Sequence, residues 1–127
     1  MKMNHKIVLT LFAGTILGGA AIHALHAQAK PPVYAIIEIN EITDAEAYKA
    51  VTQRPNSATA ATAQGARYIS RGGKITALDG APPQRIVIIA FDSVEKAKAW
   101  NDSPDQQKVI AIRNKATKAR SFIVDGL

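Results

Sequence analysis

Four consecutive β-branched apolar residues, Ile86-Val87-Ile88-Ile89, constrain the fold of this chain more than any other feature. Successive side chains of a strand point to opposite faces of its sheet, so a strand over Arg85–Phe91 is apolar on both faces. A strand of this kind belongs in the interior of a sheet. The run therefore predicts a central strand, and it requires that something covers each face of the sheet.

Three other segments also have the pattern of strands. Val33 to Asn40 alternates, with Val33, Ala35, Ile37 and Ile39 on one face and Tyr34, Ile36, Glu38 and Asn40 on the other. We expect two more strands, at Ala66–Arg71 and Ser121–Asp125. After the turn or bulge at Gly72-Gly73, the chain is expected to stay extended over Lys74–Leu78.

Capping signatures mark the starts of the helices. Thr43 and Glu46 form a predicted capping box, whose helix should run to about Gln64 with a break near Arg54, since Pro55 follows. A short helix should begin at Asp92-Ser93. Ser103-Pro104-Asp105-Gln106 is a second capping signature and should open a helix that ends near Ala119, with Val109, Ile112 and Ala116 on its inner side.

The resulting order of strand, helix, strand, strand, helix pair and strand predicts an α+β fold. It is the ferredoxin-like split βαβ sandwich, an antiparallel sheet with helices on one face only. The other face would carry Ile36 and either Ile88 or Ile89, and a monomer would leave these side chains in water. We therefore expect a homodimer that packs sheet against sheet.

Residues 1–29 have the layout of a secretory signal peptide. Two lysines precede an apolar run from Ile7 to Leu25, and Ala27-Gln28-Ala29 supplies the small residues that a signal peptidase accepts. We expect cleavage after Ala29, with cleavage after Ala27 as an alternative. The other alternative is a retained anchor, because 19 mostly apolar residues nearly span a bilayer of about 30 Å. A cleaved chain would be a single domain over 30–127, periplasmic or secreted, with no membrane segment.

The composition of residues 30–127 excludes several kinds of site. These 98 residues include 14 Lys+Arg and 10 Asp+Glu, but neither Cys nor His. The domain thus lacks the ligands of Cys/His zinc sites, iron–sulfur clusters and histidine-ligated haem, and it lacks the histidine of nucleophile–histidine catalysis. We expect no metal and no cofactor. The lysines are mixed with acidic residues, which argues against nucleic-acid binding.

Charged and aromatic residues on the predicted elements form a candidate pocket. Its members are Tyr34, Glu38, Arg67, Tyr68, Arg71, Arg85 and Trp100. A carboxylate in a sheet-lined cleft can act as a base, and arginines can orient an anionic substrate, with Arg67 or Arg85 making the contact and Glu38 tuning it. The alternative, which we favour for the charged residues, is ion pairing between neighbouring strands. Trp100 is expected in the core, and no residue is assigned a catalytic role.

Segments spread over nearly all of residues 30–127 carry a family resemblance. They are Tyr34–Glu38, Asp44–Tyr48, Gly65–Gly73, Leu78–Gly80, Arg85–Ile88, Trp100, Ser103 and Val124–Gly126. In order and spacing they resemble the bacterial family catalogued as domain of unknown function 1330. The resemblance implies a dimeric α/β barrel, in a superfamily that also contains small monooxygenases, haem-degrading enzymes, chlorite dismutases and muconolactone isomerases. It implies no particular activity.

Two classes of function remain open from the sequence. The first is a small-molecule-binding or non-catalytic dimer of the cell envelope, with an apolar or anionic ligand between sheet and helices. The second is a cofactor-independent isomerase or monooxygenase in which Glu38 or Tyr34 moves a proton. We favour the first, because a domain without histidine has few residues suited to proton transfer near neutral pH.

Overall fold

The structure is a computed structural model that describes residues 30–53 and 60–127. The predicted signal segment, residues 1–29, lies outside the described residues, and so does the expected helix break at Arg54 and Pro55. All the elements named below belong to one unit, Pro31–Leu127. In the described part of the chain, no helix is both long enough and apolar enough to cross a membrane.

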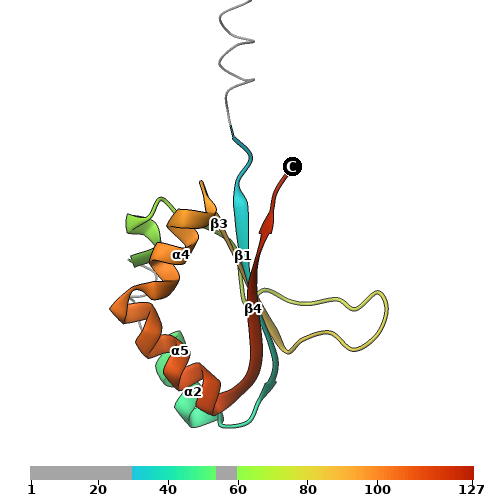
Figure 1. Ribbon diagram of the computed structural model, residues 1–127. Coiled ribbons are helices and arrows are strands. Elements are labelled where there is room, and N and C mark those ends of the chain that lie inside the picture. The colour runs from blue at the N-terminus through green and yellow to red at the C-terminus, as the bar shows by residue number, and fades with distance from the viewer. Residues whose placement is uncertain (1–29, 54–59) are drawn as a thin grey trace, which may run out of the picture. The chain divides into compact units, whose positions relative to one another are not determined.

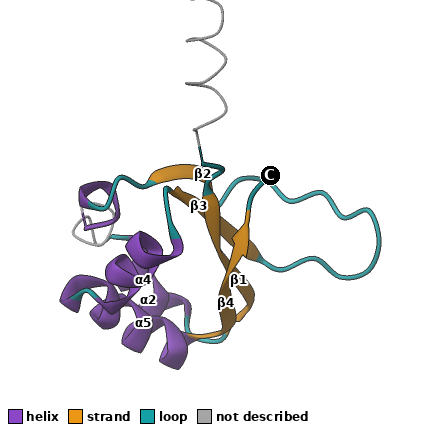
Figure 2. Ribbon diagram, turned by 45° about the horizontal axis from the view of Figure 1, so that its top comes forward, coloured by secondary structure: helices purple, strands orange, loops and turns teal. Residues whose placement is uncertain are grey.

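Four antiparallel strands form one sheet in the order β2-β3-β1-β4 (Figures 1 and 2). They are β1 (Val33–Ile42), β2 (Arg67–Arg71), β3 (Arg85–Phe91) and β4 (Thr117–Asp125). The interior position predicted for β3 is confirmed, because β3 lies between β2 and β1. β2 and β4 are the edges, so the sheet of one chain stays open and does not close into a barrel.

Helices cover one face of this sheet, which confirms the ferredoxin-like arrangement (Figures 1 and 2). Those in the described part of the chain are α2 (Ala45–Thr52), α4 (Val94–Asp102) and α5 (Pro104–Ala116). None of these covers the opposite face.

The start of α2 differs from the prediction by one residue. The N-cap is Asp44, whose carboxylate accepts a hydrogen bond from the backbone N–H of Ala47 at 3.0 Å. Thr43 is not the N-cap; its backbone N–H donates a hydrogen bond to the backbone carbonyl of Ala116 at 2.8 Å. Glu46 does not reach back to the cap but pairs with Lys49 at 2.7 Å. α2 then ends at Thr52.

Ser103 joins α4 to α5, as its capping signature predicts. Its hydroxyl donates to the carbonyl of Trp100 at 2.7 Å and accepts from the backbone N–H of Gln106 at 3.4 Å. One side chain therefore ends α4 and begins α5. Through this junction, the positions of Trp100 and Gln106 depend on each other.

The prediction that the last helix reaches Ala119 is wrong. α5 ends at Ala116 and β4 begins directly at Thr117, where the Thr117 hydroxyl donates to the carbonyl of Arg113 at 2.7 Å. From Thr117 onward the backbone pairs with β1, and this ladder competes with continuation of the helix. β4 is therefore four residues longer at its start than the predicted strand.

The link between β2 and β3 is a loop, so Lys74–Leu78 is not a continuation of the strand. β2 ends at Arg71, and Gly72 turns the chain at φ +73° while its N–H donates to the carbonyl of Ile86 at 3.0 Å. Among the described residues, strand pairing with β3 ends at Arg71. The loop extends from the sheet on the side away from the helices, with Leu78 fully exposed (Figures 1 and 2).

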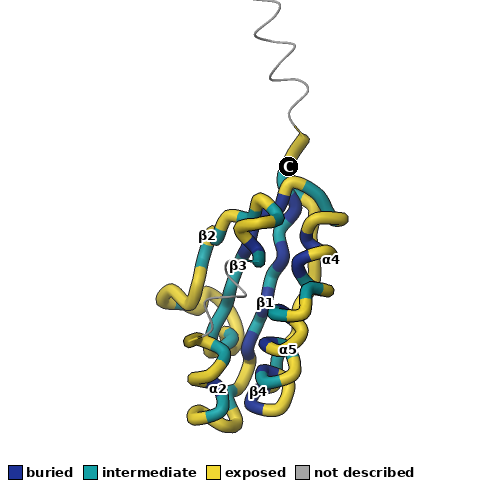
Figure 3. Tube along the Cα trace, turned by 90° about the vertical axis from the view of Figure 1, so that its left-hand side faces the viewer, coloured by how far each residue is buried: buried dark blue, intermediate teal, exposed yellow. Residues whose placement is uncertain are grey.

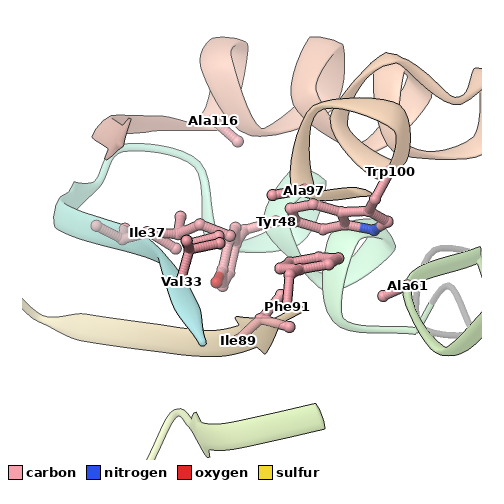
Figure 4. Close-up of a cluster of buried hydrophobic side chains, with 11 residues drawn as sticks. Val33, Ile37, Tyr48, Ala61, Ile89, Phe91, Ala97, Trp100 and Ala116 are labelled. Atoms are coloured by element: carbon pink, nitrogen blue, oxygen red, sulfur yellow. The ribbon is translucent and has the colours of Figure 1, made fainter. Parts of the chain in front are cut away.

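The core lies between the sheet and the helices. Along β1, the alternate residues predicted to share a face are buried (Figure 3). The rings of Phe91 on β3 and Trp100 on α4 pack with centroids 5.4 Å apart and planes tilted by 37° (Figure 4). Tyr48 of α2 enters the same cluster.

The second face of the sheet, here called the open face, is largely apolar. Its register places Ile88 opposite Ile36, while Ile89 lies in the core with 1% of its surface exposed. The large apolar residues of the open face include Ile36, Ile86, Ile88, Phe122 and Val124. The sequence predicts either Ile88 or Ile89 on this face, and the structure places Ile88 there.

Candidate functional site

A cavity of about 80 Å³ lies between the helix-bearing face of the sheet and α2, α4 and α5. We call it the arginine cavity. Its polar lining consists of Tyr48, Thr52, Tyr68, Arg71, Arg85, Gln106 and Arg113. Apolar side chains, among them Ile37, Val87, Ile89 and Trp100, form the rest of the wall. One water needs only about 10–15 Å³ of such space, so the cavity has room for a small polar group.

A β-bulge in β2 brings Tyr68 and Arg71 into this cavity together. Residues three apart on a regular strand point to opposite faces. In β2 the register shifts between Tyr68 and Ser70, so Tyr68 pairs with Ile89 and Arg71 with Val87, both on the helix-bearing face. The Arg71 guanidinium then lies over the Tyr68 ring, 4.8 Å from its centroid.

Arg85 begins β3, opposite the buried Ile39 of β1, and this register directs it to the same face. Its guanidinium packs against Gly72 so closely that a Cβ atom on Gly72 would collide with it. Gly72 therefore has two roles, because it adopts the left-handed backbone conformation and leaves room for the arginine.

Arg113 of α5 is the most deeply buried cation of the cavity. Only 6% of its surface is exposed, and its Nε is buried without a hydrogen-bond partner among the described residues. Burial lowers the pKa of the Arg113 guanidinium, while the nearby Tyr48 raises it to a smaller extent. A buried donor that lacks an acceptor costs free energy, so this position favours an acceptor beyond those that the described residues supply.

The two tyrosines of the cavity remain protonated at neutral pH. Burial raises the pKa of Tyr48 above its usual 10.0, although the charges of Arg85 and Arg113 lower it in part. Burial likewise raises the pKa of Tyr68, with Arg71 opposing. Both phenols are therefore available as hydrogen-bond donors.

No acidic side chain balances these arginines in the described lining of the cavity. The lining contains neither Asp nor Glu. Among the described residues, the salt bridges join Lys49 to Glu46, Lys96 to Asp92, Lys118 to Glu41 and Arg120 to Glu38, so none of them uses a cavity arginine. In the described lining, the arrangement offers cations and hydrogen-bond donors without a carboxylate base, and such an arrangement can bind and orient an anion.

The seven candidate residues predicted from the sequence do not share one site. Tyr68, Arg71, Arg85 and Trp100 line the arginine cavity, with Trp100 also in the core as expected. Tyr34, Glu38 and Arg67 belong to the open face, because their partners in β3, Ala90 and Ile86, alternate with Val87 and Ile89, which line the cavity on the helix-bearing face. Successive side chains of a strand point to opposite faces of the sheet, so the members of the two sets cannot meet in one site within a chain.

Glu38 forms the inter-strand ion pair that the sequence analysis favoured over a catalytic role. Its carboxylate accepts from the Nε of Arg120 on β4 at 2.6 Å, and its side chain is 19% exposed. Within one chain, Glu38 cannot tune Arg85, because the two residues lie on opposite faces. Glu38 and Tyr34 are the residues expected to move a proton in the alternative, enzymatic function. Neither of them lines the arginine cavity.

Sequence reasoning missed Tyr48, Gln106 and Arg113. On α5 the prediction placed Ile112 on the inner side, but Arg113 is buried and Ile112 is only half-buried. The spacing of Gln106, Val109, Arg113 and Ala116 by three or four residues is a helical stripe that could have identified the inner face. Polar residues within that stripe are the signal of a site.

The described residues contain no cluster of three His, Cys, Asp or Glu side chains that could hold a metal ion.

Comparison with known proteins agrees with this fold. A family model described as domain of unknown function (DUF1330) matches residues 32–127. No match was found among curated proteins. A solved structure of a protein of unknown function from Rhodopseudomonas palustris is similar, with a TM-score of 0.61 and 16% identity over 85% of this chain and 92% of that one.

Two further solved structures are similar at lower identity. One is a dimeric ferredoxin-like protein of unknown function from Thermobifida fusca, with a TM-score of 0.54 and 15% identity over 76% of this chain and 92% of that one. The other is SnoaB, a cofactor-independent oxygenase from Streptomyces nogalater, with a TM-score of 0.53 and 7% identity over 76% and 94%. At these identities the likeness shows a shared fold.

Proposed function

Because the chain belongs to the family described as domain of unknown function (DUF1330), which assigns no activity, we propose a function from the site itself. The protein binds a small anionic ligand in the arginine cavity and acts as a binding protein. The observation that carries this proposal is Arg113, buried to 6% exposure with an unpartnered Nε in a cavity without a described acid.

The arginines of the cavity have no acidic partner in its described lining. Three guanidinium groups line this one cavity, so their positive charges have no counter-charge among the described residues there. A carboxylate or similar anion would supply that counter-charge and accept hydrogen bonds from Arg113 and from the protonated Tyr48. Each hydrogen bond to a charged group contributes about 1.5–3 kcal/mol.

Native mass spectrometry of the protein purified from its own host tests the proposal. We expect a retained small molecule that is anionic at neutral pH, and we expect Arg113→Met to lose it. Arg67→Met is the matched control, since Arg67 lies on the open face and should leave the adduct intact. An adduct that survives Arg113→Met but is lost in Arg67→Met would overturn the assignment to this cavity.

We further propose a homodimer formed through the open face. Support comes from the apolar side chains exposed there, including Phe122 and Val124 at 42% and 45% exposure. A similar solved structure, from Thermobifida fusca, is described as dimeric. Two open faces packed together would approach the dimeric α/β barrel that the family resemblance implies.

We also propose that residues 1–29 direct export and that the mature protein, 30–127, works in the cell envelope or outside the cell. Support comes from the lysines, the apolar run and Ala27-Gln28-Ala29 in the sequence. Intact-mass measurement of the protein from its host should show a chain that begins at Lys30. A full-length species that is extracted only by detergent would instead indicate the retained anchor.

A further inference from the structure

A second cavity adjoins the arginine cavity on its β4 side. Its volume is about 210 Å³. Its apolar wall includes Ala35, Ile37, Ala97, Trp100 and Ile123. An engineered apolar cavity of about 150 Å³ accommodates benzene, so this cavity has room for a group of at least that size.

Four residues border both cavities. They are Ile37, Trp100, Gln106 and Arg113. Arg113 therefore lies at the boundary of the two cavities. A single ligand could place an anionic group in the arginine cavity and an apolar group in the second cavity. Its buried, unpartnered Nε is an independent sign that this boundary lacks an acceptor.

We propose that the ligand is a monocarboxylate with an apolar body about the size of a benzene ring. The carboxylate contacts Arg113 in the arginine cavity, and the body fills the second cavity against Ile37 and Ala97. This inference rests on the proposed function, because it specifies the anion that the arginine cavity binds. A purely polar anion would leave the apolar wall of the second cavity without a partner.

The chain itself supplies the reporter and the control for a test. Trp100 is the only tryptophan and lines both cavities, so its fluorescence reports on either. Ser121 lies on β4 at the wall of the second cavity and is exposed, so a larger side chain there can fill the cavity without disturbing the core. Ser121→Phe fills the cavity, whereas Ser121→Ala keeps it open.

The experiment is a fluorescence titration with acetate, phenylacetate and the neutral phenylacetamide. We expect phenylacetate to bind at least tenfold more tightly than acetate and at least tenfold more tightly than phenylacetamide. Ser121→Phe should remove most of the advantage over acetate without changing acetate binding, and Ser121→Ala should retain it. Circular dichroism of each variant confirms that it is folded.

The outcomes separate this inference from the proposed function. Acetate and phenylacetate binding with equal affinity, both lost in Arg113→Met, would overturn the apolar body and leave the anion site standing. Absence of binding by either carboxylate would overturn the monocarboxylate, and the anionic adduct that is lost in Arg113→Met would then decide the proposed function separately. Phenylacetamide binding as tightly as phenylacetate would show an apolar cavity that does not use Arg113.

Discussion

At the scale of single residues, Arg113 is the least expected feature of the molecule. Charged side chains are rarely buried unless they are paired, yet no described residue accepts a hydrogen bond from its Nε. A residue that lowers the stability of the empty protein is expected where a ligand later provides its partner. The same reasoning predicts that stability and binding respond in opposite directions when Arg113 is replaced.

Arg113→Met should stabilise the ligand-free protein and weaken anion binding. Replacing a buried charge with a hydrophobic side chain of similar length removes the cost of desolvation, which we expect to raise the free energy of unfolding by about 1 kcal/mol or more. For a domain of this size that is roughly 4–8 °C in Tm. Anion affinity should fall by about 1.5–3 kcal/mol. Thermal unfolding and titration measure the two effects, and a lower Tm without ligand would contradict the prediction.

Tyr48 should make stability depend on alkaline pH. Because burial raises its pKa above 10.0, the folded state keeps the phenol proton to a higher pH than the unfolded state does. This contribution to stability is fully present below pH 10 and is lost as the pH rises through the folded-state pKa. Thermal unfolding between about pH 8 and 11 should therefore show a decline in Tm that is shallower in Tyr48→Phe. Equal slopes in the variant and the parent would show that Tyr48 does not contribute, and Tyr34→Phe on the open face is the control.

At the scale of elements, the cavity is built where regular structure is interrupted. The bulge in β2 turns Arg71 to the same face as Tyr68, and the turn at Gly72 gives space to the Arg85 guanidinium. Ser103 links the two helices that supply Trp100, Gln106 and Arg113. Each of these local features positions a side chain that a regular element would direct elsewhere.

Gly72→Ala should weaken anion binding as well as stability, and Gly80→Ala provides the matched comparison. Both glycines have a positive φ, +73° and +71°, so both substitutions strain the backbone by about 1 kcal/mol. Only Gly72 has the Arg85 guanidinium in the space of the new Cβ, whereas Gly80 has no atom within 4 Å. We expect similar losses of Tm from the backbone term, with a further loss of ligand affinity in Gly72→Ala alone. Equal affinities in the two variants would show that Arg85 does not contact the ligand.

At the scale of the whole molecule, the open face is an apolar surface that the described part of one chain does not cover. Helices bury one side of the sheet, while Ile36, Ile88 and Phe122 remain on the other. The loop after β2 extends beyond that same face (Figure 1). A second copy would cover the exposed apolar surface and would meet this loop.

Ile88→Asp should convert the proposed dimer into a monomer. A carboxylate at the centre of an apolar interface has no partner there, and its desolvation opposes association. Ala111→Asp is the control, because Ala111 is exposed on α5, away from the sheet. Gel filtration with light scattering at micromolar concentration gives the mass, and circular dichroism shows whether the variant is folded. A monomeric parent protein, or an Ile88→Asp variant that is still dimeric, would contradict the interface.

The amino-acid sequence by itself determined the kind and order of the elements. The alternation along Val33–Ile39, the apolar run of β3 and the capping residues Ser93 and Ser103 act between near neighbours, so each could be identified without the fold. It also placed Arg85 on a central strand. Boundaries such as the start of β4 at Thr117 were missed, because pairing with a strand distant in sequence overrides local helix preference there.

Only the tertiary structure decided which side chains meet. A shift of one residue in strand pairing determines whether a side chain faces the helices or the open face. The bulge in β2 produces such a shift within a strand of five residues. Glu38 was therefore separated from Arg85, and Arg71 was joined to Tyr68. Arg113 lies in the cavity because α5 packs against α2 and lines the cavity together with strands far away in the chain. Packing of this kind sets burial, and burial without a described hydrogen-bond partner is what makes Arg113 the candidate binding residue.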